Sequence, residues 1–351
     1  MSESMLAAVY HGPDDLRVEQ YPRPVIDSGD ILVRVLRSGI CATDIRIFHG
    51  AHRKFPPGTV RIPGHEVVGE IVELGEEAEG FTTGQRVFIA PNFGCGYCRQ
   101  CITGNNNRCA NYDAVGITLD GSFAEFMRIP QAAIHQGNLI PLAADVGPAS
   151  AALIEPFACV LRGQEAVHIR PGENVVILGA GPIGVMHLLL AKLRGAGKVI
   201  VSEPSPERAR IARDMDASLV INPTEEDFAS VIRHETNGEG ADVVIVAAPS
   251  YKAQQESLLL AAIGGRINFF GGLPKDVPFI QLNSNLVHYN ELVVTGTTGC
   301  SSADCRKAAE LVNSELVDLS RLVSATYPLQ DTRQAFQMAE SGKALKVILE
   351  P

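Results

Sequence analysis

From residue 174 onward, the chain alternates short, wholly apolar segments with amphipathic ones. The apolar segments predict strands at 175–178, 199–201, 219–221, 243–246, 267–270 and 292–295, and the amphipathic ones predict helices at 182–193, 208–215, 227–236 and 252–263. Strands that are apolar throughout need cover on both faces, and intervening helices let successive strands run parallel. We therefore expect a doubly wound α/β sheet.

The turn between the first of these strands and its helix is rich in glycine. Gly179, Gly181 and Gly184 form a Gly-x-Gly-x-x-Gly pattern, and Pro182 and Ile183 open the helix. Such glycines permit a tight turn and a close approach of the backbone to a pyrophosphate, which the helix N-terminus attracts. The pattern predicts a dinucleotide site.

Other residues refine this prediction. Glu203 follows the next strand, where a carboxylate accepts hydrogen bonds from ribose hydroxyls and repels a 2′-phosphate, so NAD is expected in preference to NADP. Arg208 could stack on adenine or pair with a phosphate, or could be a solvated surface charge. Gly271 and Thr297 follow later strands and could line the nicotinamide end, although ordinary turns explain them equally well.

The first 150 residues have a different pattern, with short β-type runs separated by glycine and proline. These runs lie at 16–20, 31–36, 67–74, 86–89 and 123–129, and predict a barrel-like or irregular β domain. With 351 residues, the chain exceeds what one core usually organises. The last 55 residues, with expected helices at 304–314 and 332–341 and a strand at 346–349, should pack on the first domain. We expect one domain from 1–155 and 297–351, and another from 156–296.

Four cysteines lie close together within the first 150 residues. Cys95, Cys98, Cys101 and Cys109 form a Cys-x2-Cys-x2-Cys-x7-Cys run, which fits a closed, four-thiolate structural zinc site. Disulfides or an iron–sulfur cluster of unusual spacing are the alternatives. Because all four coordination positions would be filled, this metal would organise a lobe and contact no substrate.

The overall charge and the N-terminal sequence exclude other classes of protein. Lysine and arginine number 30 against 40 acidic residues, a net charge of −10, so a nucleic-acid partner is not expected. The N-terminal residues lack the features of an export signal, and no apolar run approaches the ~18 residues of a membrane span. We therefore expect a cytoplasmic protein with reduced thiols and no membrane association.

A second set of metal-binding residue types precedes the cysteine run. Cys41 is followed by Gly64-His65-Glu66, part of a Gly-His-Glu-x-x-Gly pattern that runs to Gly69. Together with the cysteine run and the glycine-rich turn, in this order and spacing, these motifs resemble the zinc-dependent medium-chain dehydrogenases, which include alcohol, sorbitol, polyol and threonine dehydrogenases. The resemblance covers essentially the whole chain.

The resemblance implies a GroES-like irregular β-barrel catalytic domain, a Rossmann coenzyme domain and two zinc ions per chain. The family's catalytic zinc ligands fall on Cys41, His65 and Glu155, with Glu66 as a direct or exchangeable ligand. Ethanol-type members have a cysteine at the position of Glu155, so the glutamate favours the polyol-type or threonine-type enzymes. A helix-start carboxylate is the structural alternative for Glu155.

The resemblance also assigns a proton relay, in which this chain departs from the family. Thr43 matches the hydroxyl that passes the alcohol proton outward, but Arg46 stands where many members have a histidine. An arginine cannot act as a base. Water could replace the histidine, His49 or His52 could substitute for it, or Arg46 could contact an anionic substrate group such as a phosphate or carboxylate.

These features lead to an expected function. We expect a zinc-dependent oxidoreductase that transfers hydride between the carbinol carbon of a secondary alcohol, such as a polyol or sugar-derived alcohol, and NAD. A threonine-type 3-dehydrogenase, a metal-free reductase on the same scaffold, and a non-catalytic nicotinamide-binding protein are the alternatives. The family commonly forms dimers or tetramers through the edge of the coenzyme sheet, so a homodimer or homotetramer is implied.

Overall fold

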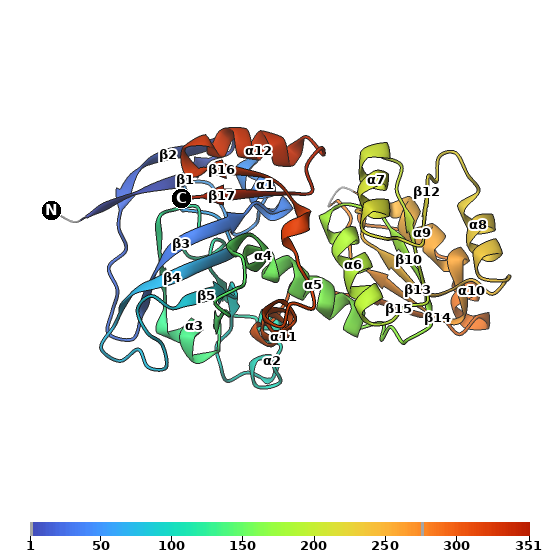
Figure 1. Cartoon of the computed structure of the whole chain (residues 1–351), viewed down its shortest axis with the longest axis horizontal. Helices are drawn as coiled ribbons and strands as arrows, with labels where there is room; N and C mark the ends of the chain where they lie inside the picture. The colour runs from blue at the N-terminus through green and yellow to red at the C-terminus, as the bar shows by residue number, and fades with distance from the viewer. Residues whose placement is uncertain (1–2, 275–276) are drawn as a thin grey trace. The chain divides into compact units, whose positions relative to one another are not determined.

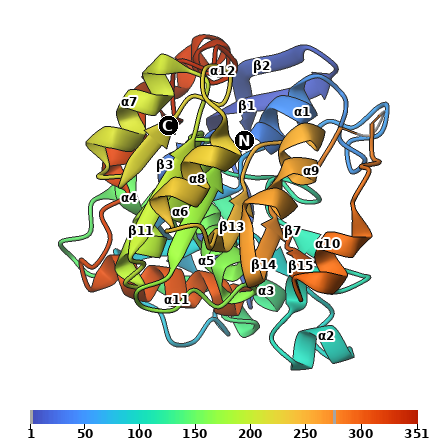
Figure 2. The ribbon, with the colours of Figure 1, turned by 90° about the vertical axis from the view of Figure 1, so that its right-hand side faces the viewer.

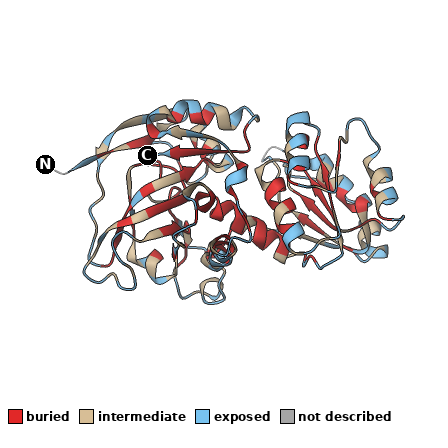
Figure 3. Ribbon diagram, in the orientation of Figure 1, coloured by how far each residue is buried: buried red, intermediate tan, exposed pale blue. Residues whose placement is uncertain are grey.

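The computed structural model describes residues 3–274 and 277–351. The chain divides into two compact units (Figure 1), one made of residues up to 158 together with 300–351, and the other of residues 159–299. The sequence-based boundaries lay at 155/156 and 296/297. Helix α5 (Ile154–Glu165) runs from the first unit into the second. Buried residues follow the central strands of each unit (Figure 3).

The second unit is a six-stranded parallel sheet with the order β12-β11-β10-β13-β14-β15. This is the order of a doubly wound dinucleotide-binding fold, as expected. Its strands are β10 (Asn174–Leu178), β11 (Lys198–Ser202), β12 (Leu219–Ile221), β13 (Ala241–Val246), β14 (Ala261–Phe269) and β15 (Val293–Gly296). Both faces of the central strands are covered, which explains why β10 and β13 are apolar almost throughout.

Helices cover both faces of this sheet (Figures 1 and 2). Helices α6 (Pro182–Leu193) and α7 (Pro206–Asp214) lie on one face, and α8 (Phe228–Glu235), α9 (Tyr251–Leu260) and α10 (Ser284–Tyr289) lie on the other. The expectation that α9 would extend to residue 263 is wrong. Ala261 already pairs with Ala241 of β13, and Gly264 has φ +74°, which helical backbone does not allow.

The first unit is built around a seven-stranded sheet with the order β16-β17-β3-β4-β5-β9, with β8 paired to β3. Its strands are β3 (Ile31–Gly39), β4 (Glu66–Leu74), β5 (Arg86–Ile89), β8 (Phe126–Ile129), β9 (Leu139–Pro141), β16 (Val323–Pro328) and β17 (Lys346–Glu350). Two small sheets accompany it, β1 (Ser4–Gly12) with β2 (Asp15–Pro22), and β6 (Asn92–Phe93) with β7 (Asp113–Ala114). The expected strand at 123–129 is shorter than predicted, because β8 begins only at Phe126.

Among the described residues, the start of α5 and six further α-helices complete the first unit. They are α1 (Ala42–Phe48), α2 (Arg99–Ile102), α3 (Gln131–His135), α4 (Pro148–Ala152), α11 (Ser302–Asn313) and α12 (Thr332–Glu340). β17 pairs with β3, so the C-terminal segment is part of the first unit's sheet. In the register of this sheet, Gly39 lies opposite both Glu66 of β4 and Ile348 of β17. These two pairings determine where the side chains of the candidate site lie.

His187 of α6 makes the stability of the second unit dependent on pH. Burial lowers the pKa of His187 from 6.5 to about 3, and its ring packs edge-on against Phe270. The folded state thus resists protonation, so stability is fully present above pH ~6.5 and is lost as the pH falls towards 3. We expect wild-type protein to lose about 2 kcal/mol from this group between pH 8 and pH 5.

Denaturant unfolding measures the free energy of unfolding at pH 8 and at pH 5. The decrease in this free energy between the two pH values should be about 2 kcal/mol smaller in His187→Gln than in wild type. His135→Gln, which changes an exposed histidine of the first unit, is the control and should behave as wild type. An equal pH dependence of His187→Gln and wild type would contradict the assignment.

Candidate metal centres and dinucleotide site

The four cysteines of the run converge on one point. Their sulfur atoms all lie within 4.8 Å of one another, with 3.5 Å between Cys98 and Cys101 and 3.7 Å between Cys98 and Cys109. A tetrahedron with Zn–S bonds of about 2.3 Å has sulfur atoms roughly 3.8 Å apart, whereas a disulfide bond is about 2.05 Å long. The arrangement fits a four-thiolate metal site.

The backbone around the run is fixed by neighbours from other segments. The side-chain amide of Gln136 accepts a hydrogen bond from Gly94 N at 2.8 Å and donates one to Gly94 O at 2.7 Å. A Cβ on Gly94 would lie 2.3 Å from the sulfur of Cys101, so only glycine fits there. Asn106 accepts a hydrogen bond from Ser302 N at 3.1 Å, which ties the lobe to α11.

The thiols of the lobe differ in acidity when no cation is present. Backbone hydrogen bonds, first that of Tyr97, lower the pKa of Cys95 to about 6. Burial raises the pKa of Cys101 to about 12. Four thiolates within this spacing would repel one another strongly, so the lobe needs a bound cation to hold all four in the ligating form.

Cys41, His65 and Glu66 form a second group, with ligand atoms within 4.8 Å of one another. Cys41 precedes α1 and follows β3. Glu66 begins β4 and His65 directly precedes it, so the pairing of β3 with β4 brings the three residues together. His65 and Glu66 are buried and Cys41 is partly buried. A thiol, an imidazole and a carboxylate in a buried group are the ligand types that zinc prefers.

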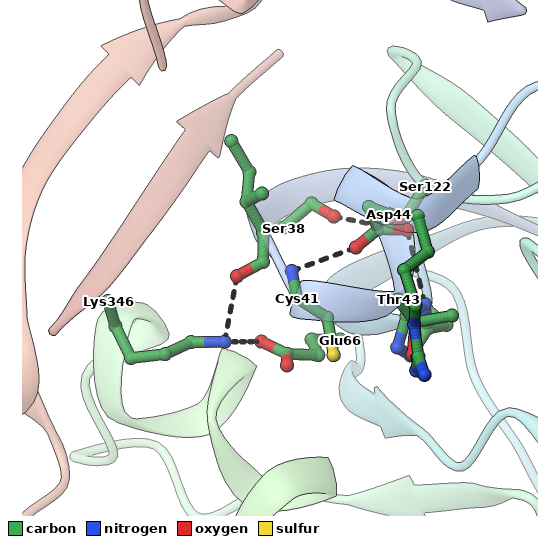
Figure 4. Close-up of polar contacts among 10 residues, drawn as sticks. Ser38, Cys41, Thr43, Asp44, Glu66, Ser122 and Lys346 are labelled. Carbon is green, nitrogen blue, oxygen red and sulfur yellow. Dashed lines mark hydrogen bonds and ion pairs between the residues drawn. The ribbon is translucent and has the colours of Figure 1, made fainter. Parts of the chain in front are cut away.

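Asp44 supports this group from α1 and was missed by the sequence analysis. Its Oδ2 accepts a hydrogen bond from Cys41 N at 2.8 Å (Figure 4), and its Oδ1 lies 3.3 Å from His65 Nδ1. Ligating histidines typically turn their second ring nitrogen towards such a carboxylate. The detectable signal was the position of Asp44 three residues after the N-cap Cys41, as in a capping box.

The electrostatics of this group favour a bound cation. Burial by itself would lower the pKa of His65, but the negative charges of Asp44 and Cys41 raise it well above its usual value. Glu66 Oε1 is buried and has no hydrogen-bond partner within the described part of the chain, whereas His65 Nδ1 faces the carboxylate of Asp44. A positive charge is therefore stabilised here, beside an unpaired carboxylate oxygen.

The structure does not place Glu155 in the Cys41 group. Glu155 lies at the start of α5 and accepts a hydrogen bond from the thiol of Cys300, with 3.5 Å between Sγ and Oε1. It belongs to a separate group of possible ligands with Cys300 and, one turn along α5, Cys159. Of the expected ligands, Cys41 and His65 have ligand atoms within 4.8 Å of each other, and Glu66 is the carboxylate grouped with them. As a metal ligand, Glu155 stays a prediction.

The residues considered for the proton relay have separate surroundings. Arg46 Nη2 donates a hydrogen bond to Thr43 Oγ1 at 3.0 Å. His49 bridges Asp14 at 2.6 Å and Glu340 at 2.5 Å, and those two hydrogen bonds, Glu340 first, raise the pKa of His49. Burial, with the nearby charge of Arg46, lowers the pKa of His52 to about 4. Of these three side chains, only Arg46 makes a hydrogen bond to Thr43.

The glycine-rich turn of the second unit has the geometry that the sequence predicted. Gly179 has φ +106°, a conformation that favours glycine, and Gly181 is the N-cap of α6. A Cβ on Gly184 would lie 1.8 Å from Gly179 O, so only glycine allows the helix to pack this close to the turn. Pro182 and Ile183 form the first turn of α6, as expected.

A cavity of about 360 Å³ lies beside this turn and is lined by Gly179, Glu203 and Arg208, among others. The carboxylate of Glu203 accepts hydrogen bonds from Ala180 N at 2.7 Å and Ser205 N at 2.9 Å, so it also holds the turn in place. Further lining residues were not found by sequence reasoning. They include Thr224, Ala248, Ser250 and Lys252.

Gly271 and Thr297 lie outside the lining of this cavity. A Cβ on Gly271 would lie 2.5 Å from Ala248 O, so Gly271 allows a close backbone approach. Thr297 lies beside Asn268, whose Nδ2 donates a hydrogen bond to Thr297 Oγ1 at 3.4 Å. Their roles at the nicotinamide end stay predictions.

Comparisons with known proteins agree with this geometry. Residues 27–141 match the model of the alcohol dehydrogenase GroES-like domain, and residues 182–314 match that of the zinc-binding dehydrogenases. A sorbitol dehydrogenase of Halalkalibacterium halodurans is 32% identical, over 99% of this chain and 98% of the relative. An L-threonine 3-dehydrogenase of Caldanaerobacter subterraneus subsp. tengcongensis is 33% identical, over 93% of each chain.

Among solved structures, a zinc-binding dehydrogenase of Sinorhizobium meliloti bound to NADP has a TM-score of 0.91, 30% identity and full coverage of both chains. The chain belongs to the zinc-dependent medium-chain dehydrogenases, with a GroES-like domain and a Rossmann-type domain. Within the described residues, none of the helices has the length and apolar character needed to cross a membrane.

The cysteine lobe yields a prediction about stability. Cys95→Ser should remove one metal ion per chain and lower the thermal midpoint by on the order of 5 °C, because the remaining thiolates cannot close the tetrahedron. Metal analysis and calorimetry measure both effects. Cys305→Ser is the control. It changes a buried thiol that belongs neither to the group of Cys95 nor to the group of Cys41, so it should keep the full metal content. Unchanged zinc in Cys95→Ser would exclude the lobe as a metal site.

Proposed function

We propose that this protein is a zinc-dependent, NAD-linked dehydrogenase of secondary alcohols, with a polyol or sugar-derived alcohol as substrate. The observation that carries the proposal is the largely buried group of Cys41, His65 and Glu66, in which a positive charge is stabilised and Oε1 of Glu66 has no hydrogen-bond partner among the described residues. The cavity of about 360 Å³ at the glycine-rich turn supports it.

Zinc at this group would act as a Lewis acid that lowers the pKa of an alcohol hydroxyl and so favours hydride loss from the same carbon. Cys41 and His65 would hold the ion, Asp44 would orient His65, and Glu155 is the proposed carboxylate ligand, with Glu66 as an exchangeable one. One thiolate and one carboxylate neutralise the charge of Zn²⁺, so neutral alcohols can enter without an excess of charge.

Thr43 is proposed to pass the alcohol proton outward. Arg46 donates a hydrogen bond to Thr43 Oγ1, so the hydroxyl oxygen is held by a cation and its own hydrogen can point elsewhere. Arg46 cannot remove the proton itself, and His49 is already bonded to two carboxylates. Water or His52 is therefore the proposed outer proton acceptor.

The cofactor is proposed to bind at the glycine-rich turn, with the pyrophosphate at the N-terminus of α6. Glu203 lines the cavity beside this turn and would disfavour the 2′-phosphate of NADP. Arg208 and Lys252 also line it and would partly offset that repulsion. We propose NAD as the preferred cofactor, with a preference that depends on Glu203.

A threonine-type 3-dehydrogenase is the second candidate, and the likeness to L-threonine 3-dehydrogenases favours it. It would use the same metal group on an amino-acid alcohol. A metal-free reductase would not need buried ligands at Cys41, His65 and Glu66, and a non-catalytic nicotinamide-binding protein would show no turnover.

A substrate panel tests the proposal. We expect formation of NADH with at least one secondary alcohol from a set of polyols and threonine, and loss of this activity on chelation.

Two variants test the proposed roles of single residues. Cys41→Ser should lower kcat/KM at least ~1000-fold while keeping NADH binding. Glu203→Ala should lower the ratio of kcat/KM with NAD to kcat/KM with NADP. Absence of turnover in a zinc-loaded protein would favour the non-catalytic alternative.

We also propose a homo-oligomer formed through the edge of the second sheet. β15 is an edge strand, and Val293, Tyr289 and Ile263 near this edge are exposed. An exposed apolar edge strand is a site for strand pairing, and a second copy of the chain would extend the sheet.

The oligomeric state tests this proposal. The mass measured by light scattering should be at least twice the 37.6 kDa of one chain. Val293→Lys should lower that mass, whereas Val25→Lys, also at an exposed valine, should not.

A further inference from the structure

The segment 45–64 lies between the proposed metal ligands Cys41 and His65 and is strongly basic. It contains three arginines and one lysine but no acidic residue, in a chain whose net charge is −10. The four cations are Arg46, Arg53, Lys54 and Arg61. Because acidic residues outnumber basic ones in the chain as a whole, this segment is a local excess of positive charge next to the Cys41 group.

Packing holds the segment in place on the first unit. Phe55 is buried, and its ring meets the ring of Tyr10 edge-on, with 5.2 Å between the centroids. The guanidinium of Arg61 lies 5.0 Å from the centroid of the Phe55 ring. It also donates hydrogen bonds to Lys54 O at 3.2 Å and to Ile117 O at 2.6 Å. Arg61 thus has a structural role and fixes the course of the segment.

Arg46 and Arg53 differ from Arg61 in being exposed and without a counter-charge. Neither forms an ion pair with any carboxylate in the part of the chain that the structure describes. Arg34, an exposed arginine of the same unit, instead pairs with Glu70 at 3.1 Å. The two guanidinium groups of the segment are therefore available to an anion from outside the chain.

Both of these arginines lie near the Cys41 group. Arg46 Nη2 donates a hydrogen bond to Oγ1 of Thr43, the proposed proton relay, at 3.0 Å. His52 lies within electrostatic range of Arg46, Arg53 and His65 together. The same side chain is thus close to both exposed cations and to a proposed metal ligand, so an anion bound by the arginines would lie beside the metal group.

The chemistry of the guanidinium group indicates the kind of anion. Its planar set of N–H donors matches two oxygens of a phosphate or a carboxylate, whereas a neutral hydroxyl gains little from an unpaired positive charge. One thiolate and one carboxylate would neutralise the charge of Zn²⁺, so the metal itself would not select for charge. Discrimination between charged and neutral alcohols would then depend on the arginines.

We propose that the substrate alcohol carries an anionic group, a phosphate or a carboxylate, which Arg46 and Arg53 bind while the carbinol lies at the Cys41 group. This inference rests on the proposed function and narrows its substrate class to acidic polyols or acidic sugar derivatives. The same cations would repel the ammonium group of threonine, so the inference favours this class over the threonine-type candidate.

Calorimetric binding tests the proposal without turnover. Sorbitol, sorbitol 6-phosphate and gluconate have the same number of carbon atoms and many hydroxyls, but differ in charge. Zinc-loaded wild-type protein should bind at least one of the two anions about tenfold more tightly than sorbitol, and high salt should reduce this difference. The tighter of the two anions identifies the group as a phosphate or a carboxylate.

Variants of the full-length protein then assign the preference to the two arginines. In Arg46→Gln/Arg53→Gln, the anion and sorbitol should bind within about twofold of each other, because the charges and donors are gone. Arg170→Gln is the control, since Arg170 is an exposed arginine of the second unit that likewise has no ion pair among the described residues. It should keep the wild-type preference.

Three results would overturn the inference. They are wild-type protein that binds neither anion more tightly than sorbitol, a double variant that keeps the preference, and an Arg170→Gln variant that loses it as well. Turnover separates these failures from failure of the proposed function. If neutral polyols reduce NAD in a chelator-sensitive reaction without any preference for anions, only the inference fails. If none of the alcohols is turned over, the proposed function fails, and the inference with it.

Discussion

The candidate site depends above all on the register of three strands in the first unit. Gly39 at the end of β3 pairs with Glu66 of β4 and with Ile348 of β17. These pairings bring together Cys41, His65 and Lys346, although the lysine lies about 300 positions along the chain from the cysteine. A slip of one residue in either pairing would turn Glu66 or Lys346 to the opposite face of the sheet. Backbone hydrogen bonding therefore holds the chemistry in place.

Charge balance is the second constraint on this site. Cys41, Asp44 and Glu66 place three groups that can carry negative charge in a buried region, with Lys346 as the buried amine. Such a group is stable only if further positive charge is supplied, by protonation of His65 or by a metal. The same imbalance that would destabilise the bare site would favour the binding of a divalent cation. The stability of this group and the proposed function thus depend on the same electrostatic interaction.

Much of the second unit could be predicted from the sequence because its determinants are local. Wholly apolar runs gave the parallel strands, and the glycines at 179, 181 and 184 are required by backbone geometry within a single turn. The end of α9 was predicted wrongly because pairing of Ala261 with Ala241 overrides the local helical pattern. Glu203 lines the cavity as expected, but its two hydrogen bonds to the turn were not visible in the sequence.

In the first unit, the sequence by itself determined which residue types are available for metal binding, because ligand chemistry belongs to the side chains. It also determined the cysteine lobe, whose ligands lie within fifteen residues and need only a few turns to converge. Only the tertiary structure decided three contacts. Glu155 accepts a hydrogen bond from the thiol of Cys300, the carboxylate of Asp44 faces His65, and Lys346 forms an ion pair with Glu66. Strand pairing and packing between distant segments set these contacts, and no spacing along the chain encodes them.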